Sequence, residues 1–210
     1  MNNGYIIDAT NVRKTYRSSK NEVNALQGVD LQIKAGEMVA VMGPSGCGKT
    51  TLLNCLSGLD TIDDGKVLLE GESIHDMPDR RRTELRRKRM GFVFQSYNLL
   101  PVLSSVQNVE LPLIIGGTPR REAHEQAKSM LEMVDLGNRL DHRPMELSGG
   151  EQQRVAIARA LVTTPAIVWA DEPTGNLDSE RSAEIMNLLT RLNEEHNQAI
   201  IMVTHDGGIG

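Results

Sequence analysis

Apolar residues along the chain fall into two kinds of segment. Short runs rich in Val and Ile, broken by Gly or Asn, predict strands. Longer segments with apolar residues three and four positions apart predict helices. Because the two kinds alternate over much of the chain, the pattern favours an α/β fold with a mainly parallel sheet. The predicted strands are 5–16, 23–33, 37–43, 65–74, 90–95, 166–171 and 199–205, and the predicted helices are 50–59, 119–134, 179–196 and one that begins after Ser148.

Two segments carry more specific predictions. The run EMVAVMG at 37–43 is apolar throughout its centre and ends in glycine, which is typical of a strand buried on both faces. Thr118 followed by Pro119 predicts the N-cap and the first position of a helix. The apolar positions of that helix fall on one face, namely Ala123, Ala127, Met130, Leu131 and Val134.

The order of the segments predicts a single domain over residues 1–210. A small N-terminal antiparallel β region precedes an α/β core, and a helical subdomain of about 96–147 is inserted in that core. The chain has 210 residues, 39% of them hydrophobic and 24% charged, which provides enough apolar material for a large core. No internal repeat or low-complexity linker divides the sequence.

Charge, cysteines and the length of apolar runs limit the classes of function. The formal net charge is −5, whereas nucleic-acid-binding proteins are usually basic, so no nucleic-acid partner is expected. Cys47 and Cys55 give no disulfide framework and fit a reducing cytosol. The N-terminus lacks the apolar segment of a signal peptide, and runs such as MVAVM and AIVWA are too short to cross a bilayer. A role at a membrane therefore requires a partner.

The stretch RRRTELRRKR, residues 80–89, is strongly basic. A solvated helix face is the structural interpretation, which the pattern favours. Proximity to acidic lipid headgroups or to a loop of a partner is the alternative.

Residues 43–50, GPSGCGKT, match the pattern G-x-x-x-x-G-K-[ST] of a phosphate-binding loop. The glycines let backbone N–H groups turn inward around phosphates, and the N-terminus of the helix that follows favours an anion. We expect Lys49 to reach the β- and γ-phosphates and Thr50 to ligate Mg²⁺. Cys47 lies inside this loop, either as a tolerated small side chain or as a thiol activated by the helix N-terminus.

Polar side chains stand at the ends of three predicted strands. Asp171 ends the strand 166–171, at the edge where open α/β sheets bind ligands, and an Asp there can hold Mg²⁺. Glu172 follows directly and can orient or deprotonate an attacking water. Gln95 and His205 end two other strands and are candidates for contacts to a γ-phosphate. An acidic turn and ordinary polar surface are the structural alternatives.

A second pair of glycines, Gly149 and Gly150, opens the helix after Ser148. Ser148 and Glu151 have the S-x-x-E spacing of a capping box. The box does not explain the glycines, since each costs roughly 0.8–1 kcal/mol relative to Ala in a helix interior. They indicate that something approaches the backbone closely, and the free N–H groups of a helix start form a second anion site.

Taken in order, GPSGCGKT, Gln95, LSGGEQQR, ADEPTGNLD and His205 resemble the nucleotide-binding subunit of an ABC transporter, and the likeness covers nearly the whole chain. The resemblance implies an ABC ATPase cassette with a P-loop NTPase core, which hydrolyses ATP with Mg²⁺. In this family two cassettes close head to tail, and each ATP lies between one subunit's phosphate loop and the other subunit's LSGG motif. The resemblance therefore implies a homodimer in which the second pair of glycines serves the partner's ATP.

The resemblance also assigns roles at the nucleotide site. Tyr16 matches the aromatic residue that stacks on adenine, and Gln95 matches the contact to Mg²⁺ and water. Asp171 matches the acid of the Mg²⁺ site, Glu172 the catalytic base and His205 the switch histidine. The positions of the phosphate loop expected to bind ATP are Gly43, Ser45, Gly46, Cys47, Gly48, Lys49, Thr50 and Thr51.

Other matched positions act across the interface between two cassettes. Ser148, Gly149 and Gly150 match the contact to the partner's γ-phosphate, and Asp178 in GNLD matches the loop that joins the two sites. Glu151 stands where many family members have Gln. We expect little effect from this difference, because Glu also serves the capping box.

Stretches such as NALQGVDLQI and QSYNLLPVLSSVQNVELPL resemble the subgroup used in lipoprotein release, macrolide-type export and antimicrobial-peptide resistance. The implied partner is an integral membrane permease, with the chain cytoplasmic and peripheral on the inner face of the cell membrane. We expect YNLLPVLSSV, residues 97–106, to be partly exposed and to form a groove for a helix of that permease. Family members continue past the switch histidine with a helix and strands, so we expect a cassette truncated after His205.

Three functions stay open. The first is an ATPase subunit that drives export or extraction, the second is a cell-division-type subunit that transmits force, and the third is a soluble cassette acting on ribosomes or DNA. Soluble members usually carry two cassettes or a long coiled-coil insertion, and this chain has neither, which favours transport. The transported substrate cannot be named, because its contacts would lie in the membrane partner.

Overall fold

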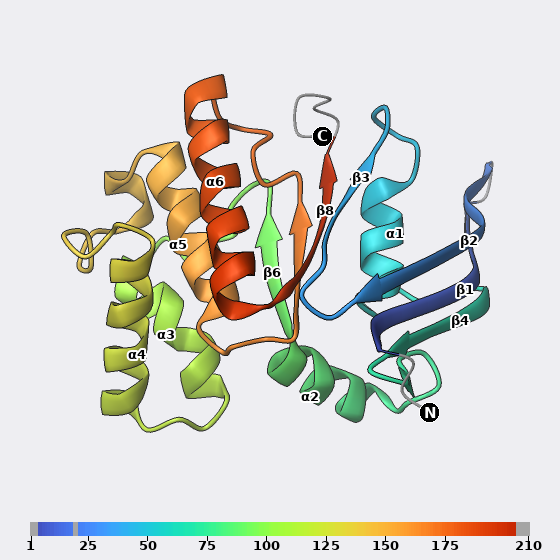
Figure 1. The fold of residues 1–210 in the computed structure, drawn as a ribbon, viewed down its shortest axis with the longest axis horizontal. Helices are drawn as coiled ribbons and strands as arrows, with labels where there is room; N and C mark the ends of the chain where they lie inside the picture. The colour runs from blue at the N-terminus through green and yellow to red at the C-terminus, as the bar shows by residue number, and fades with distance from the viewer. Residues whose placement is uncertain (1–3, 19–20, 205–210) are drawn as a thin grey trace.

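The computed structural model describes residues 4–18 and 21–204, which form two sheets and the helices that pack against them (Figure 1). The N-terminal sheet is antiparallel, with the strand order β2-β1-β4-β5. Its formation confirms the small antiparallel region predicted from the sequence. The strands are β1 (Tyr5–Arg17), β2 (Glu22–Lys34), β4 (Asp64–Leu69) and β5 (Glu72–Ser73).

The second sheet is parallel, with the strand order β3-β8-β7-β6. Its central strands are almost wholly apolar and buried on both faces, because layers of structure cover the sheet from both sides. The α/β core predicted from the alternation of strands and helices is therefore confirmed. The strands are β3 (Met38–Met42), β6 (Met90–Phe94), β7 (Ile167–Asp171) and β8 (Ala199–Thr204).

Helices lie on both sides of the parallel sheet (Figure 1). Helices α3 and α4 come from the segment expected to form a helical subdomain, and they pack on each other and on α5. The bounds of the helices are α1 (Lys49–Leu56), α2 (Asp79–Arg89), α3 (Ser105–Ile115), α4 (Arg120–Met133), the 3₁₀ helix η1 (Pro144–Glu146), α5 (Gly149–Leu161) and α6 (Ser179–His196).

Two apolar clusters lie on opposite faces of the parallel sheet. In β8, Ile201 and Val203 pack in the cluster that contains α1 and the antiparallel sheet, whereas Ile200 and Met202 pack in the cluster that contains α3 to α6. This division follows from the two-residue period of a strand, which sends successive side chains to opposite faces. Helices α1 and α5 are therefore separated by the sheet.

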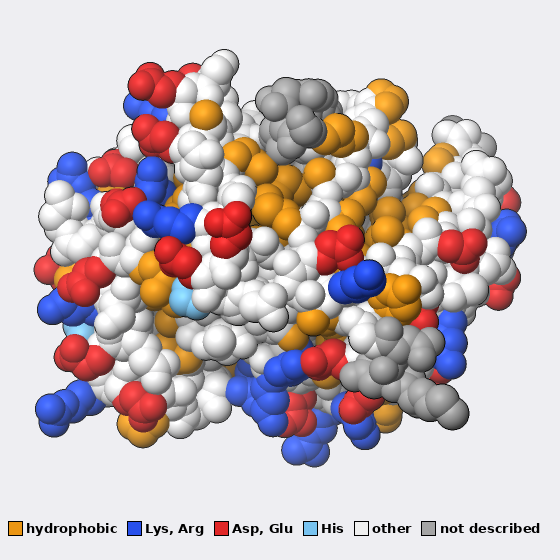
Figure 2. Space-filling view, viewed as in Figure 1, with side chains coloured by type: hydrophobic (Ala, Val, Ile, Leu, Met, Phe, Trp, Pro, Cys, Tyr) orange, Lys and Arg blue, Asp and Glu red, His pale blue; other side chains and the backbone are white. Residues whose placement is uncertain are grey.

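Strand β3 departs from its prediction, because it is not buried on both faces. It is the edge strand of its sheet, and of the side chains on its α5–α6 face only Met38 packs against the apolar cluster. Ala40 is exposed, and Met42 is 44% exposed. Figure 2 shows hydrophobic side chains reaching the surface in this region. The apolar run at 37–43 correctly predicted a strand of a parallel sheet, but it did not show whether the strand lies at the edge or in the centre of that sheet.

The start of α4 also differs from its prediction. Pro119 occupies the N-cap with ψ 138°, and Arg120 is the first helical residue, so Thr118 is not the cap. Without a side chain able to accept a hydrogen bond, Pro119 leaves the first turn uncapped by side chains. The predicted apolar face is correct, with Ala123, Ala127, Leu131 and Val134 buried and Met130 partly buried.

The basic stretch forms most of α2, which has no buried residue. Arg86 donates to the carbonyl of Gly58 at 2.6 Å, and Arg89 forms an ion pair with Glu70. These contacts within the chain favour the structural interpretation of the stretch. Among residues 4–18 and 21–204, no helix has the length and apolar content needed to span a membrane.

Candidate functional site

The loop 43–50 connects β3 to α1, and its glycines are required by its shape. Gly46 has φ 80° and Gly48 has φ 95°, in the region that favours glycine. A Cβ on Gly48 would lie 2.6 Å from the carbonyl oxygen of Ala25. That carbonyl comes from β2 at a register shift, where Lys14 pairs with Leu26 and Thr15 with Asn24. The antiparallel sheet therefore supports the loop directly.

Lys49 begins α1 and is buried, with only 8% of its surface exposed. Its ammonium donates to the carbonyls of Gly43 at 2.8 Å and Pro44 at 3.0 Å. The loop thus holds a positive charge at its centre, next to the N-terminus of α1. Both features favour the binding of an anion.

A cleft of about 550 Å³ lies in front of the loop. This size is within the range of small-molecule sites. Tyr16 from β1 and Glu172 from the end of β7 line it together with the loop. The full lining is Tyr16, Val23, Asn24, Ala25, Gln27, Ser45, Gly46, Cys47, Gly48, Lys49, Thr50, Thr51 and Glu172.

A hydroxyl–carboxylate pair joins the loop to the parallel sheet. Thr50 Oγ1 donates to Asp171 Oδ1 at 3.0 Å, although the two residues are far apart in the sequence. Burial raises the pKa of Asp171, the charge of Glu172 raises it further, and the Thr50 bond and Lys49 only partly offset this. A cation beside Asp171 would stabilise its ionised form.

Glu172 and Gln95 converge beside the same pair. Glu172 has φ 46°, a left-handed conformation that is uncommon outside glycine, and its N–H donates to the carbonyl of Val203 at 2.9 Å. A Cβ on Gly175 would meet Gln95 Nε2 at 2.8 Å and Glu172 Oε2 at 3.2 Å, so both side chains reach the same place. The carboxyl ends of β6 and β7 therefore bring Gln95 and Glu172 together, as was predicted from their positions at strand ends.

The predicted capping box is present at the start of α5. Ser148 Oγ accepts from the N–H of Glu151 at 3.3 Å, and Glu151 Oε2 accepts from the N–H of Ser148 at 2.8 Å. The hydrogen bond from the Ser148 backbone lowers the pKa of Glu151, and Arg139 adds to the effect. The box is therefore charged at neutral pH.

The two glycines of α5 have different surroundings. A Cβ on Gly149 would lie 3.0 Å from the hydroxyl of Tyr97, a tight contact that would require the Tyr97 side chain to move by a few tenths of an ångström. A Cβ on Gly150 would meet only Arg181, at 3.6 Å, which is an ordinary contact. Nothing in the described part of the chain requires glycine at 150. None of these residues lines the cleft, because α5 lies on the other face of the sheet.

Asp178 and Asn176 lie in the loop between β7 and α6. Asp178 is the N-cap of α6 and accepts from the N–H of Arg181 at 2.9 Å. Asn176 donates to the carbonyl of Gln95 at 2.8 Å. This loop therefore contacts the strand end that carries Gln95. The remaining predicted site residue, His205, lies outside the described residues.

The sequence reasoning missed the part of the cleft contributed by β2, which includes Asn24 and Gln27. It also missed a buried lysine, Lys14, next to Tyr16. The only signal for Lys14 was its position two residues before Tyr16 in a predicted strand, which places both side chains on one face. No sequence motif marks the β2 residues. They lie near the loop because of a shift in the register of β1 and β2, which the sequence does not reveal.

Phosphoryl transfer to water requires a cradle for the phosphates, oxygen ligands for a divalent cation and a group that orients the water. The cleft provides candidates for each at the carboxyl edge of a parallel sheet. The fold and the site together therefore define a nucleoside triphosphatase of the P-loop class.

Comparisons with known proteins narrow this class. The family model described as "ABC transporter" matches residues 26–175. An uncharacterized ABC transporter ATP-binding protein of Thermotoga maritima is 50% identical over 96% of this chain and 86% of that protein. The lipoprotein-releasing system ATP-binding protein LolD of Hydrogenovibrio crunogenus is 47% identical over 96% of this chain and 87% of that protein.

A solved structure agrees with this placement. The dimeric, post-hydrolysis structure of the ATP-binding cassette MJ0796 bound to ADP and Pi has a TM-score of 0.87 and 44% identity, covering 97% of this chain and 89% of that chain. The chain belongs to the ABC transporter family, as an ATP-binding cassette that hydrolyses ATP.

Proposed function

We propose that two copies of the chain close head to tail around two molecules of MgATP. The observation that carries this proposal is Gly150, a glycine in the first turn of α5 that nothing within the described chain requires. Helices α1 and α5 pack on opposite faces of the parallel sheet, and no residue at the start of α5 lines the cleft in front of the phosphate loop. In the proposed dimer, one ATP contacts the phosphate loop of one copy and the start of α5 of the other copy. Ser148, Gly149 and Gly150 would then bind the γ-phosphate held by the partner, with Asp178 near the junction.

The cleft accounts for the binding of one nucleotide. Tyr16 would stack on the base, and the backbone N–H groups from Ser45 to Thr51 would surround the phosphates. Lys49 would contact the β- and γ-phosphates. The hydroxyl of Thr50 and the carboxylate of Asp171 are oxygen donors of the kind that Mg²⁺ prefers, and Gln95 reaches the same region. When bound, Mg²⁺ neutralises charge that develops on the phosphate oxygens.

Glu172 is the proposed general base. It would accept a proton from the attacking water, whose oxygen displaces ADP from the γ-phosphate to give inorganic phosphate. The left-handed backbone at Glu172 directs its carboxylate into the cleft beside Gln95. Gln95 would orient the same water, and His205 would contact the γ-phosphate.

The substitution Glu172→Gln tests this role, because Gln has the same shape but cannot accept the proton. We expect the turnover of ATP to fall by about 10²–10⁴-fold while ATP binding persists. The mutant should also accumulate as an ATP-bound dimer in gel filtration. Glu180→Gln, an exposed carboxylate in the first turn of α6, is the matched control. Turnover at the wild-type rate in Glu172→Gln would exclude Glu172 as the base.

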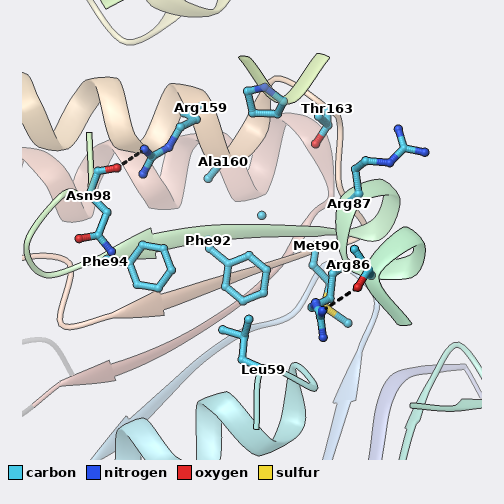
Figure 3. Close-up of a pocket in the computed structure, with 13 residues that line it drawn as sticks. Leu59, Arg86, Arg87, Met90, Phe92, Phe94, Asn98, Arg159, Ala160 and Thr163 are labelled. Atoms are coloured by element: carbon cyan, nitrogen blue, oxygen red, sulfur yellow. Dashed lines mark hydrogen bonds between the residues drawn. The ribbon is translucent and has the colours of Figure 1, made fainter. Parts of the chain in front are cut away.

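The partner is proposed to be a membrane permease that docks in a groove on the face of β6. The groove encloses about 380 Å³, and its floor is apolar, with Leu59, Phe92 and Phe94 pointing into it (Figure 3). Arg86 and Arg87 lie at one end, and Asn98 and Arg159 at the other. An amphipathic helix with an acidic residue fits this combination of apolar floor and basic ends.

The groove differs in part from the expected one. Asn98 of the stretch 97–106 lines it, whereas Leu100 and Val102, which are 43% and 73% exposed, do not. Docking there would place the chain on the cytoplasmic face of a membrane. The lipoprotein-releasing relative makes export or extraction the proposed process that ATP hydrolysis drives.

A further inference from the structure

Lys14 is the buried lysine of β1, with 6% of its surface exposed. Its ammonium has three N–H groups, and each has an acceptor. They donate to Asp60 Oδ1 at 3.0 Å, to the carbonyl of Thr61 at 2.7 Å and to Thr61 Oγ1 at 3.1 Å. A buried charge with complete hydrogen bonding is held in one position.

Asp60 joins this lysine to the cleft. Its second oxygen, Oδ2, accepts from the hydroxyl of Tyr16 at 2.7 Å, while Oδ1 also accepts from the N–H of Thr61 at 2.7 Å. The N–H of Asp60 donates to the carbonyl of Asn54 at 3.1 Å, within α1. One carboxylate therefore connects Tyr16 and Lys14 of β1 to the helix that follows the phosphate loop.

Lys14 also lies over the ring of Tyr16, with Nζ 5.2 Å from the ring centroid. Tyr16 lines the cleft, but Lys14, Asp60 and Thr61 do not. The ring is therefore held from behind by a cation, by a hydrogen bond at its hydroxyl and by the strand, and it is open on the side of the cleft. A ring fixed at both the face and the edge has few orientations available.

The charges of the three groups are suited to this arrangement. Burial lowers the pKa of Lys14, but the hydrogen bond and charge of Asp60 outweigh it, and the pKa stands above its ordinary value. Burial opposes ionisation of Asp60, yet hydrogen bonds from Tyr16 and Lys14 hold its pKa below the ordinary value. Burial and the Asp60 bond raise the pKa of Tyr16. At neutral pH the cluster contains an ammonium, a carboxylate and a neutral phenol.

We propose that Lys14 and Asp60 are positioning residues for the nucleotide base, which hold the ring of Tyr16 so that a base stacks on its open face. The proposal rests on the role of Tyr16 in the proposed function. It predicts that the pair contributes to affinity for the base and not for the phosphates. The positions of Tyr16 and the phosphate loop are coupled through Asp60, which sets the distance between base and phosphate sites.

The test compares two ligands that share phosphates but differ in the base. Equilibrium binding of MgATP and of magnesium tripolyphosphate is measured by calorimetry for the full chain carrying Lys14→Met, Asp60→Asn or Tyr16→Phe. Each variant should bind MgATP about three- to tenfold more weakly, the usual effect of losing one such contact, and should bind tripolyphosphate as the wild type does. Tyr16→Phe retains both the ring and the Lys14–Asp60 pair, so it tests the hydroxyl without disturbing the buried charges.

Arg13→Met provides the matched control, since Arg13 lies next to Lys14 on β1, is half-exposed, and pairs with Asp64 of β4 at 4.0 Å. It should leave both affinities unchanged. Equal losses for MgATP and tripolyphosphate in the variants would overturn the proposal, because a purely structural role would affect both ligands. Tyr16→Ala separates the two ideas. If Tyr16→Ala lowers the affinity for MgATP while Lys14→Met and Asp60→Asn do not, the positioning role is wrong but stacking by Tyr16 stands. If Tyr16→Ala has no effect on the affinity for MgATP, the proposed stacking by Tyr16 is wrong.

Discussion

The two cysteines illustrate how position within α1 and its loop determines reactivity. Cys55 is buried, and burial together with the nearby charge of Asp60 raises the pKa of its thiol to about 11. Cys47 is exposed and lines the nucleotide cleft. Because the thiolate is the reactive form, Cys55 is protected both by its surroundings and by its pKa.

Labelling with a bulky maleimide at pH 7 should therefore modify Cys47 alone. The adduct would fill part of the cleft, so we expect ATP binding to be lost, and bound MgATP should slow the labelling. Mass spectrometry of the intact and digested protein measures the site and extent of the reaction. Cys47→Ser is the control and should remain unlabelled. Full ATPase activity after stoichiometric modification of Cys47 would show that this side chain does not block the site.

At the residue scale, the site residues that belong to a motif of fixed spacing or to the end of an apolar run could be predicted from the sequence. GPSGCGKT specifies both a backbone shape and a chemistry, and the strand ends at Gln95 and Asp171 follow from runs of apolar residues. Lys14 was not predicted, because its burial depends on Asp60 and Thr61, which are distant in sequence and reach it only after the antiparallel sheet packs on α1. The close approach of Tyr97 to Gly149 was also not predicted, since Tyr97 comes from another segment.

At the scale of elements, the two ends of α5 lie beside the two proposed contact sites. Its start carries the capping box and the glycines, and near its end Arg159 donates to the carbonyls of Tyr97 and Asn98 at 2.8 and 2.5 Å. Those two residues have φ 61° and 48°, an unfavourable conformation outside glycine that Arg159 stabilises. Helix α5 was predicted, but the hydrogen bonds of Arg159 to these carbonyls were not. Every residue has a backbone carbonyl, so the sequence does not indicate which ones accept from a distant side chain.

Docking of a permease in the groove on the face of β6 can be tested by a change at Leu59. This residue lies at the floor of the groove and is 47% exposed. Leu59→Asp places a charge where we propose that an apolar helix face binds, so association with membrane vesicles from cells producing the chain should fall at least about tenfold. Nucleotide binding should persist, because Leu59 does not line the cleft. Sedimentation with the vesicles measures the association.

Met145→Asp is the control for this change, because Met145 is 91% exposed on η1 and lies outside the groove. Its association with vesicles should match that of the wild type. Equal sedimentation of Leu59→Asp and wild type would argue that the permease binds elsewhere.

At the scale of the whole molecule, the two apolar clusters hold α1 and α5 on opposite faces of the parallel sheet. The phosphate loop follows the carboxyl end of β3, and the glycine pair lies beside Leu177 and Arg181, which follow the carboxyl end of β7. Because β3 and β7 run parallel, the loop and the glycine pair both lie toward the same edge of the sheet, while α1 and α5 pack on its two faces. A twofold axis at this edge would pair each phosphate loop with the other chain's glycines, which is an isologous contact because both copies use the same patch. The proposed dimer has two such shared sites.

Complementation between two inactive variants tests this sharing. Lys49→Ala removes the ammonium of the phosphate loop. Gly150→Glu adds a carboxylate where we propose that the partner's γ-phosphate binds, and its Cβ would meet Arg181 at 3.6 Å, so the capping box of α5 is preserved. Each variant alone should be nearly inactive, because both shared sites of its homodimer are damaged. In a mixed dimer both lesions fall in one site, and the other site combines the intact loop of the Gly150→Glu chain with the intact glycines of the Lys49→Ala chain. We expect ATPase activity to return to a fraction of the wild-type rate, in proportion to the mixed dimers measured with two affinity tags. If each chain used its own glycines, every site would keep a lesion, and purified mixed dimers would be as inactive as either parent.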